Sequence, residues 1–186
     1  MAPSQRILDL AEHLVQTRGY NGFSYADIAA SLGVTKASLH YHFPAKAALG
    51  RELIGRYERN FLTALAAIDA RAKSPREKLR RYAGIYADVL AQGRMCLCGM
   101  LAAEYTTLPK AMQQELKHYF AENERWLAAV LEEGRRSGGL AFAGSARDAA
   151  SLLVSSLEGA MLLARSHGNV KRFRALAERL VAHLAA

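Results

Sequence analysis

The chain has 186 residues, of which 51% are hydrophobic and 23% are charged, and its formal net charge at pH 7 is +8. This composition is typical of a helix-rich globular protein, and the positive charge favours a polyanionic partner. Runs of alternating β-branched residues, an N-terminal signal peptide and uncharged apolar stretches of membrane length are all missing from the sequence. Their absence argues against a sheet, a secreted protein and a membrane protein. We therefore expect an all-α protein in the cytoplasm.

The first predicted helix covers residues 4–18 and ends at Gly19. Its apolar residues recur at the spacing of one helical stripe, which is typical of a helix packed on a core. The residues of the stripe are Ile7, Leu10, Ala11, Leu14 and Val15. We expect this helix to support the segment that follows it.

Residues 24–46 predict two short helices joined by a tight turn. Ser24 is a good N-cap, and Asp27, three residues on, completes a pattern close to a capping box. Gly33 ends the first of the two helices, and Thr35 caps a second helix from Lys36 to about His42. Two helices in this arrangement match the helix-turn-helix unit, whose second helix enters the major groove of DNA.

The second of these helices has an outer face suited to contact with DNA. At about 100° per residue, Leu39 and Phe43 face inward while Ala37, Ser38 and Tyr41 face outward. The small residues allow a close approach to bases, and several donors surround them that can bond base edges or phosphates. These donors are Lys36, Tyr41, His42 and Lys46. By spacing alone, a plain helical hairpin in a bundle is the alternative.

The segment FSYADIAASLGVTKASLHYHFPAKAAL resembles the DNA-binding signature of TetR-family (tetracycline-repressor-like) transcriptional regulators, with a match from about Ile7 to Leu49. The resemblance implies base contacts in the groove, phosphate contacts beside it, and backbone contacts next to these. The groove residues are Thr35, Lys36, Ala37 and Ser38, the phosphate residues are Tyr41, His42 and Lys46, and the flanking residues are Ser24 and Tyr25. His40 departs from the Tyr that is usual in the family, and it is included as a DNA-binding candidate.

Two further helices are predicted after Pro44. The first runs to about residue 72 with apolar residues at helical spacing, and its length suits a mechanical link between a sensing body and a DNA-binding head. A long core helix without such a role fits the same pattern. Ser74 and Pro75 begin the next helix, which continues to about Ala91, and Gly93 ends it.

Cys96 and Cys98 lie near the start of a short predicted helix that begins at Cys98 or Gly99 and ends at Tyr105. A helix N-terminus and the nearby Arg94 both favour a reactive thiolate. The alternative is that both cysteines are small core residues. Two cysteines supply only half of a zinc shell, so we expect no metal. The segment also resembles, more weakly, one in TetR-family members that respond to electrophiles through cysteine.

A long helix is predicted from about Pro109 to Arg136, with Asn123 inside its apolar stripe. A polar group in that position needs a partner on another helix or on a ligand. Aromatic and Met side chains in this part of the chain fit a mixed pocket or a plain core. The family resemblance implies that an effector pocket is enclosed here. Its candidate residues are Phe61, Tyr86, Cys98, Met100, Phe120, Asn123, Trp126 and Met161.

The last two predicted helices cover residues 146–166 and 170–184. The first is apolar almost all round and therefore needs cover on most of its sides. Helix-turn-helix proteins commonly bind two half-sites as dimers, so we expect these two helices to pair with their copies in a second subunit. The family resemblance implies the same homodimer.

Taken together, the sequence predicts a DNA-binding domain (residues 1–48) and an effector-binding and dimerisation domain (residues 49–186), with about nine helices. The expected function is a homodimeric repressor, without cofactor or enzymatic activity, that a small-molecule or electrophile effector releases from a palindromic operator on duplex DNA. Two alternatives stay open: a thiol-based redox enzyme that uses Cys96 or Cys98, and a helical interaction protein without a DNA role.

Overall fold

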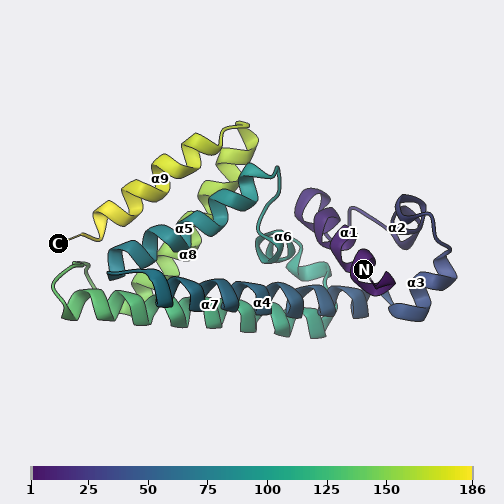
Figure 1. The fold of residues 1–186 in the computed structure, drawn as a ribbon, viewed down its shortest axis with the longest axis horizontal. Coiled ribbons are helices and arrows are strands. Elements are labelled where there is room, and N and C mark those ends of the chain that lie inside the picture. The colour runs from purple at the N-terminus through teal and green to yellow at the C-terminus, as the bar shows by residue number, and fades with distance from the viewer. Residues whose placement is uncertain (1, 186) are drawn as a thin grey trace. The chain divides into compact units, whose positions relative to one another are not determined.

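The computed structural model describes residues 2–185. These residues form nine α-helices and one short 3-10 helix, η1, and they contain no strand, which confirms the expected all-α class (Figure 1). The elements are α1 (Pro3–Arg18), α2 (Tyr25–Leu32), α3 (Lys36–His42), α4 (Lys46–Arg71), α5 (Pro75–Ala91), α6 (Leu97–Ala103), η1 (Tyr105–Thr107), α7 (Lys110–Arg136), α8 (Ala146–Ser166) and α9 (Val170–His183).

The chain divides into two compact units. The first contains Met1–Asn60 and Cys96–Tyr119, and the second contains Phe61–Met95 and Phe120–Ala186. The helices α4 and α7 contribute residues to both. The first unit therefore extends beyond residue 48 and includes α6, η1 and the beginning of α7.

In the first unit, α1 packs against both α2 and α6, and α2 packs against α3. The core is apolar, and Ala11, Ile28 and Leu39 at its centre have no exposed surface. Arg56 of α4 holds α1 through two ion pairs, one to Asp9 at 2.6 Å and one to Glu12 at 2.5 Å. The long helix α4 is thus connected directly to α1.

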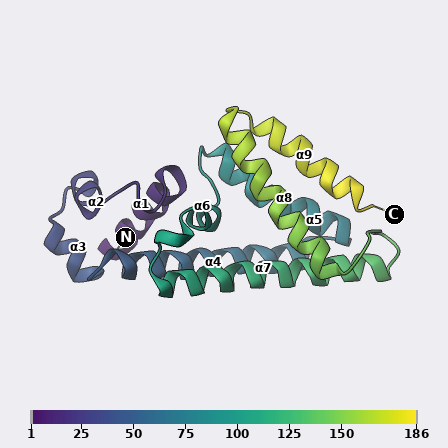
Figure 2. The same cartoon turned by 180° about the vertical axis from the view of Figure 1, so that it is seen from behind.

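In the second unit, α5, α8 and α9 pack on one another (Figure 2). Leu79, Leu157, Met161 and Phe173 are fully buried between them. The apolar residues of α8 and α9 explain this packing, because each helix buries an apolar face against its neighbours.

The short helix α6 begins one or two residues earlier than the sequence predicts and ends at Ala103. The sulfur of Cys96 accepts a hydrogen bond from the amide of Gly99 at 3.4 Å, so Cys96 acts as the N-cap. The chain then tightens into η1, and the carbonyls of Tyr105 in η1 and of Leu108 directly after it accept from the Gln113 side chain of α7.

Candidate DNA-binding surface

The helices α2 and α3 begin at the predicted caps. Ser24 and Asp27 form a complete capping box: the Ser24 amide donates to the Asp27 carboxylate at 2.7 Å and the Ser24 hydroxyl accepts from the Asp27 amide. These bonds to Ser24 hold the pKa of Asp27 below its ordinary value. Thr35 caps α3 by accepting from the Ser38 amide at 3.2 Å. Between the helices, Gly33 adopts a left-handed conformation with φ of 65°.

The end of α3 is fixed from α2 by a buried tyrosine. The hydroxyl of Tyr25 donates to the carbonyl oxygen of Phe43 at 2.8 Å. Burial and the neighbouring Tyr20 raise the pKa of Tyr25 to about 12, so its hydroxyl remains a donor. The sequence placed Tyr25 beside the DNA backbone, but in the structure its hydroxyl already donates to an acceptor within the protein.

The outer side of α3 carries the expected small and donor residues. Thr35, Lys36 and Ala37 are exposed, and Ser38 is half-buried beside them. Tyr41 has 84% of its surface exposed, and its ring meets that of half-buried His42 edge-on at 5.2 Å. A helix with small central residues and flanking donors can approach base edges closely.

Two predicted DNA-binding residues also have partners inside the head. The ring nitrogen Nδ1 of His40 lies 3.1 Å from the carbonyl oxygen of Pro44. The ammonium of Lys46 donates to the carbonyl oxygen of Tyr20 at 2.5 Å and to that of Phe23, and it lies over both aromatic rings. Burial lowers the pKa of Lys46, while Glu104 and Asp27 oppose that shift. The geometry gives Lys46 a role within the head that the sequence pattern did not indicate.

Two residues near this surface were not singled out from the sequence. Val34, in the turn between the two helices, is an exposed apolar residue, with 36% of its surface accessible. Glu104, at the end of α6, accepts hydrogen bonds from the amides of Tyr20 and Asn21. The sequence shows an apolar residue, Val34, directly before the cap of a helix, and this pattern could have indicated the first of them. Glu104 lies 84 residues from Tyr20, so no local pattern in the sequence indicates their contact.

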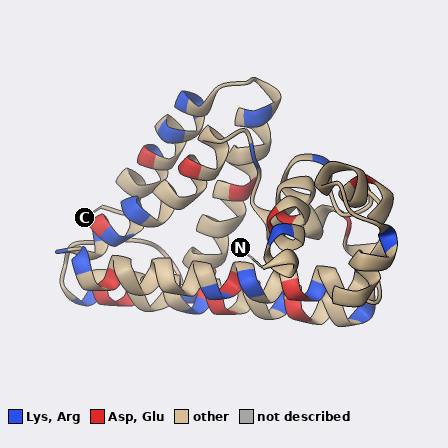
Figure 3. Cartoon of the chain, turned by 45° about the vertical axis from the view of Figure 1, so that its right-hand side comes forward, with Lys and Arg blue, Asp and Glu red and all other residues tan. Residues whose placement is uncertain are grey.

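The net charge of the protein does not gather on the head. Residues 1–48 contain four Lys or Arg and three Asp or Glu, which leaves +7 of the net +8 to the rest of the chain. Figure 3 shows basic residues along helices throughout the chain rather than concentrated on α2 and α3. Binding by the head must therefore depend on a few well-placed groups more than on a strong overall field.

In the second unit, a buried polar network surrounds Asn123 of α7. The Tyr82 hydroxyl donates to Oδ1 of Asn123 at 2.8 Å, and Nδ2 of Asn123 donates to the Tyr86 hydroxyl at 3.3 Å. The expectation that Asn123 needs a partner on another helix is met by α5.

An aromatic cluster lies next to this network. The Trp126 indole stacks on Tyr82 and donates to Asp69 at 2.8 Å, while Phe61 meets Tyr82 edge-on.

The eight predicted effector residues divide between the two units. Six belong to the second unit, where Phe61, Tyr86, Asn123 and Met161 are buried and Phe120 and Trp126 are half-buried; Cys98 and Met100 belong to the first unit. Both thiols are buried, with 2% of Cys96 and none of Cys98 exposed. The Tyr57 hydroxyl lies 3.7 Å from the sulfur of Cys96.

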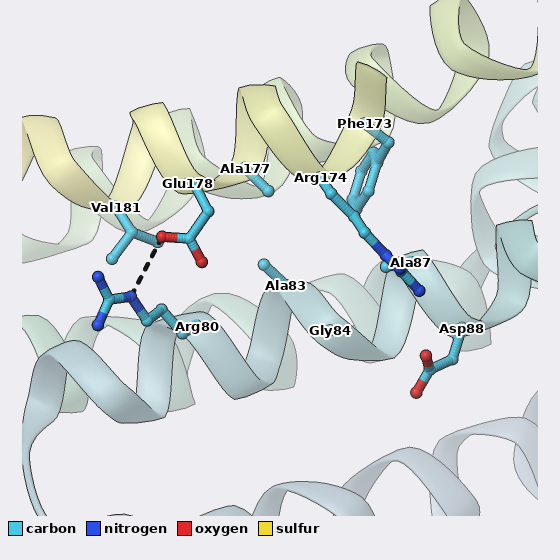
Figure 4. Close-up of a pocket in the computed structure, with 10 residues that line it drawn as sticks. All are labelled: Arg80, Ala83, Gly84, Ala87, Asp88, Phe173, Arg174, Ala177, Glu178 and Val181. Atoms are coloured by element: carbon cyan, nitrogen blue, oxygen red, sulfur yellow. Dashed lines mark hydrogen bonds and ion pairs between the residues drawn. The ribbon is translucent and has the colours of Figure 1, made fainter. Parts of the chain in front are cut away.

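A surface groove of about 370 Å³ runs between α5 and α9 (Figure 4). Small side chains at Ala83, Ala87 and Ala177 leave space between the helices, and a side chain at Gly84 would meet nothing within 4 Å. Arg80 pairs with Glu178 at 3.2 Å at one end of the groove. The eight predicted effector residues are not among those that line it.

Within residues 2–185, no three His, Cys, Asp or Glu side chains come close enough to hold a metal ion together. The same part of the chain contains no helix with the length and apolar character needed to cross a bilayer.

Comparison with known proteins identifies the family. Residues 7–53 match the family described as bacterial regulatory proteins, tetR family, and residues 65–179 match the C-terminal domain of LmrA/YxaF-like transcriptional regulators. The chain belongs to the TetR family. It is therefore a DNA-binding transcriptional regulator, and the family is one of regulators rather than of thiol enzymes.

Individual TetR-family relatives agree over nearly the whole chain. A TetR-family regulator from Agrobacterium tumefaciens is 35% identical, with a TM-score of 0.95 over 98% of this chain and 97% of that one. A TetR regulator from Legionella pneumophila is 30% identical, with a TM-score of 0.90 over 99% and 98%. The HTH-type transcriptional regulator LmrA of Bacillus subtilis is 27% identical over 89% of this chain and 87% of its own length.

Proposed function

We propose that this TetR-family regulator is a repressor that binds a near-palindromic operator as a homodimer and is released by an effector. The observation that carries the operator contact is the exposed face of α3, where Lys36 and Tyr41 stand on either side of Ala37 and Ser38. We assign base contacts to Thr35, Lys36, Ala37 and Ser38, and phosphate contacts to Ser24, Tyr41 and His42. Val34, exposed at the preceding turn, suits contact with a thymine methyl group.

Tyr25, His40 and Lys46 have acceptors or partners within the head. We propose that they fix the two helices and do not contact phosphate directly. A residue whose donors are already engaged would have to exchange those bonds for contacts with DNA, which reduces the net gain.

Selection of bound sequences from a random duplex library tests the operator contact. We expect a palindrome, and we expect Lys36→Ala to weaken binding to it by about 1–3 kcal/mol and to relax the choice of base at one position in each half-site. Tyr41→Ala should weaken binding more evenly across sequences. Lys117→Ala is a matched control, because it removes one exposed cation from the same unit. Normal operator affinity in both test variants would contradict the assignment of α3.

The homodimer is supported by an exposed apolar face on α8. Leu152, Leu162 and Leu163 are 69%, 59% and 51% exposed, and they share one side of the helix with Ser155 and Gly159. Several exposed leucines on one helix are typical of an interface with another protein. A side chain at Gly159 would meet nothing within 4 Å, so a second helix could approach closely there.

Sedimentation measurements on leucine variants test the dimer. We expect Leu162→Glu to shift the protein to monomer and to abolish tight operator binding, because a single head contacts only one half-site. Leu62→Glu provides the control, since Leu62 is 40% exposed on α4. A monomeric wild-type protein would overturn this part of the proposal.

For the effector, we propose the aromatic and polar group of the second unit, which comprises Phe61, Tyr86, Phe120, Asn123, Trp126 and Met161. The Tyr82–Tyr86–Asn123 network offers polar groups within an apolar surround, which is the composition of small-molecule sites. A ligand that binds there must differ in affinity between the operator-bound and the released conformations.

The thiols are a second route to release, through Cys98 with Met100 beside it and through Cys96. Operator binding should be measured with a non-covalent ligand library and with a thiol-reactive electrophile. Release by the electrophile that is lost in Cys96→Ser or Cys98→Ser would establish thiol sensing, and the burial of both sulfurs predicts slow modification. Release that is lost only in Asn123→Ala would favour binding at the aromatic and polar group of the second unit.

A further inference from the structure

The turn from Gly19 to Phe23 is held between two opposite charges. On one side, the carboxylate of Glu104 accepts hydrogen bonds from the Tyr20 amide at 2.6 Å and from the Asn21 amide at 3.2 Å. On the other side, the ammonium of Lys46 donates to the carbonyl oxygens of Tyr20 and Phe23. The amides of the turn thus face an anion, while its carbonyls face a cation.

The Glu104 carboxylate fits this turn closely. A β-carbon on Gly19 would lie 2.8 Å from Oε1 of Glu104, so a residue with a side chain cannot occupy that position without displacing the carboxylate. The Asn21 side chain adds a second contact, because its Nδ2 donates to the Thr107 hydroxyl at 2.8 Å. The Thr107 hydroxyl in turn donates to the carbonyl of Glu104 at 2.8 Å.

A carboxylate at the position of Glu104 does not stabilise the end of α1. Gly19 is the C-cap of α1, and the C-terminal end of a helix carries partial negative charge, which repels a carboxylate. Two amide bonds and the nearby Lys46 offset this repulsion. The arrangement is therefore specific to the turn.

The turn is the covalent connection between α1 and the helix-turn-helix unit. Immediately after it, Ser24 caps α2, and Tyr25 fixes the end of α3 through Phe43. Glu104 lies at the other end of α6 from Cys96, the N-cap of that helix. A displacement of α6 would therefore withdraw the carboxylate from the turn that orients the two DNA-binding helices.

From this geometry we infer that Glu104 is a positioning residue for operator binding, which fixes the turn before α2 and thereby the orientation of α2 and α3, with Lys46 as its counterpart on the carbonyl side of the turn. The inference rests on the proposed operator contact of α3. We assign Glu104 no DNA contact of its own, because its carboxylate oxygens accept the Tyr20 and Asn21 amides.

The direction in which Glu104→Gln changes operator affinity distinguishes a positioning role of Glu104 from an effect of its charge alone. Glu104→Gln removes one negative charge from the DNA-binding unit, which by electrostatics alone would strengthen binding to any duplex. Glutamine keeps only one acceptor oxygen, so at best it retains the Tyr20 bond and the longer 3.4 Å contact that the Asn21 amide makes with the same oxygen, and the 3.2 Å bond from the Asn21 amide is lost. We expect operator affinity to fall at least about fivefold, the lower end of typical coupling between sites, while affinity for a non-operator duplex stays the same or rises.

The experiment compares operator and non-operator binding of the full-length protein in three variants, together with amide hydrogen exchange. Glu115→Gln is the control, because it makes the same charge change in the same unit, at a carboxylate paired with Arg51 2.7 Å away. Asn21→Ala leaves Glu104 in place and removes only the bond to Thr107, so it should show a smaller loss in the same direction. It also serves if Glu104→Gln does not fold. Faster exchange at Tyr20 and Asn21 should accompany the loss in Glu104→Gln.

An unchanged or increased operator affinity in Glu104→Gln would overturn the inference. An equal loss of operator and non-operator binding would also overturn it, since that would indicate a general loss of folded protein. A wild-type protein that selects no operator would instead contradict the proposed function on which the inference rests. Selective loss of operator binding in Glu104→Gln, with Glu115→Gln normal, would support it.

Discussion

The hydroxyl of Tyr25 donates a 2.8 Å hydrogen bond to the backbone carbonyl oxygen of Phe43. Tyr25 is the first residue of α2 and Phe43 is the C-cap of α3, so the bond connects the two ends of the helix-turn-helix unit. Because burial raises the pKa of Tyr25, the hydroxyl keeps its proton across the physiological pH range.

Tyr25→Phe should reduce the free energy of unfolding by about 1–3 kcal/mol, because the Phe43 carbonyl remains buried without its donor. Urea denaturation measures this change. Tyr41→Phe is the matched control: its hydroxyl belongs to a residue that is 84% exposed, so stability should be unchanged while operator affinity falls. Equal stability of the two variants would show that the Tyr25 bond does not hold the unit together.

Gly19→Ala and Gly33→Ala should destabilise the protein by different amounts, although both glycines have positive φ. At Gly33, with φ of 65°, a β-carbon would meet nothing within 4 Å, so only backbone strain of about 1–2 kcal/mol is expected. At Gly19, with φ of 85°, the β-carbon would also collide with the Glu104 carboxylate. We therefore expect Gly19→Ala to unfold at a clearly lower temperature than Gly33→Ala in thermal denaturation. A smaller effect at Gly19 than at Gly33 would contradict the close fit of Glu104.

Asn123→Ala should destabilise the second unit, because the Tyr82 and Tyr86 hydroxyls lose a buried partner. An unsatisfied buried polar group costs about 1–3 kcal/mol, which denaturant unfolding can measure. Gln114→Ala, at an exposed position of the same helix, should change stability little. If the two variants unfold at the same denaturant concentration, the network does not contribute to stability.

Asp27 should contribute to the free energy of unfolding in a way that depends on pH. The hydrogen bonds from Ser24 lower the pKa of Asp27 in the folded protein. Its contribution is therefore present above the ordinary aspartate pKa, which is about 4, and is lost as pH falls through the lower folded value. Unfolding free energies measured from roughly pH 2 to 6 should show a smaller slope in Asp27→Asn than in the wild type. An identical slope would exclude Asp27 as a source of the acid sensitivity.

Local sequence signals predicted the helices well. The capping residues Ser24, Thr35 and Ser74 all lie where a helix begins in the structure. These interactions span three or four residues, so the sequence within one helical turn contains all of the groups involved. The family resemblance added the expectation of a DNA-binding head, which the comparisons confirmed.

The sequence was less informative about the direction of long side chains. Lys46 follows α3 and has the charge that suits a phosphate, yet its ammonium is engaged by carbonyls 26 and 23 residues earlier in the chain. The periodicity of a helix gives the face on which a residue lies, but a lysine at the first position of a helix can turn toward several different partners.

The sequence by itself determined the all-α class, most of the helix ends and the helix-turn-helix unit, because caps, glycines and apolar stripes act over a few residues. Only the tertiary structure decided that Glu104 and Lys46 hold the same turn and that Asn123 bonds two tyrosines of α5. These contacts join residues 23 to 84 positions apart, and they depend on how the helices pack. A hydrogen bond between distant residues forms only once packing has brought its donor and acceptor within about 3 Å, and no local pattern encodes that distance.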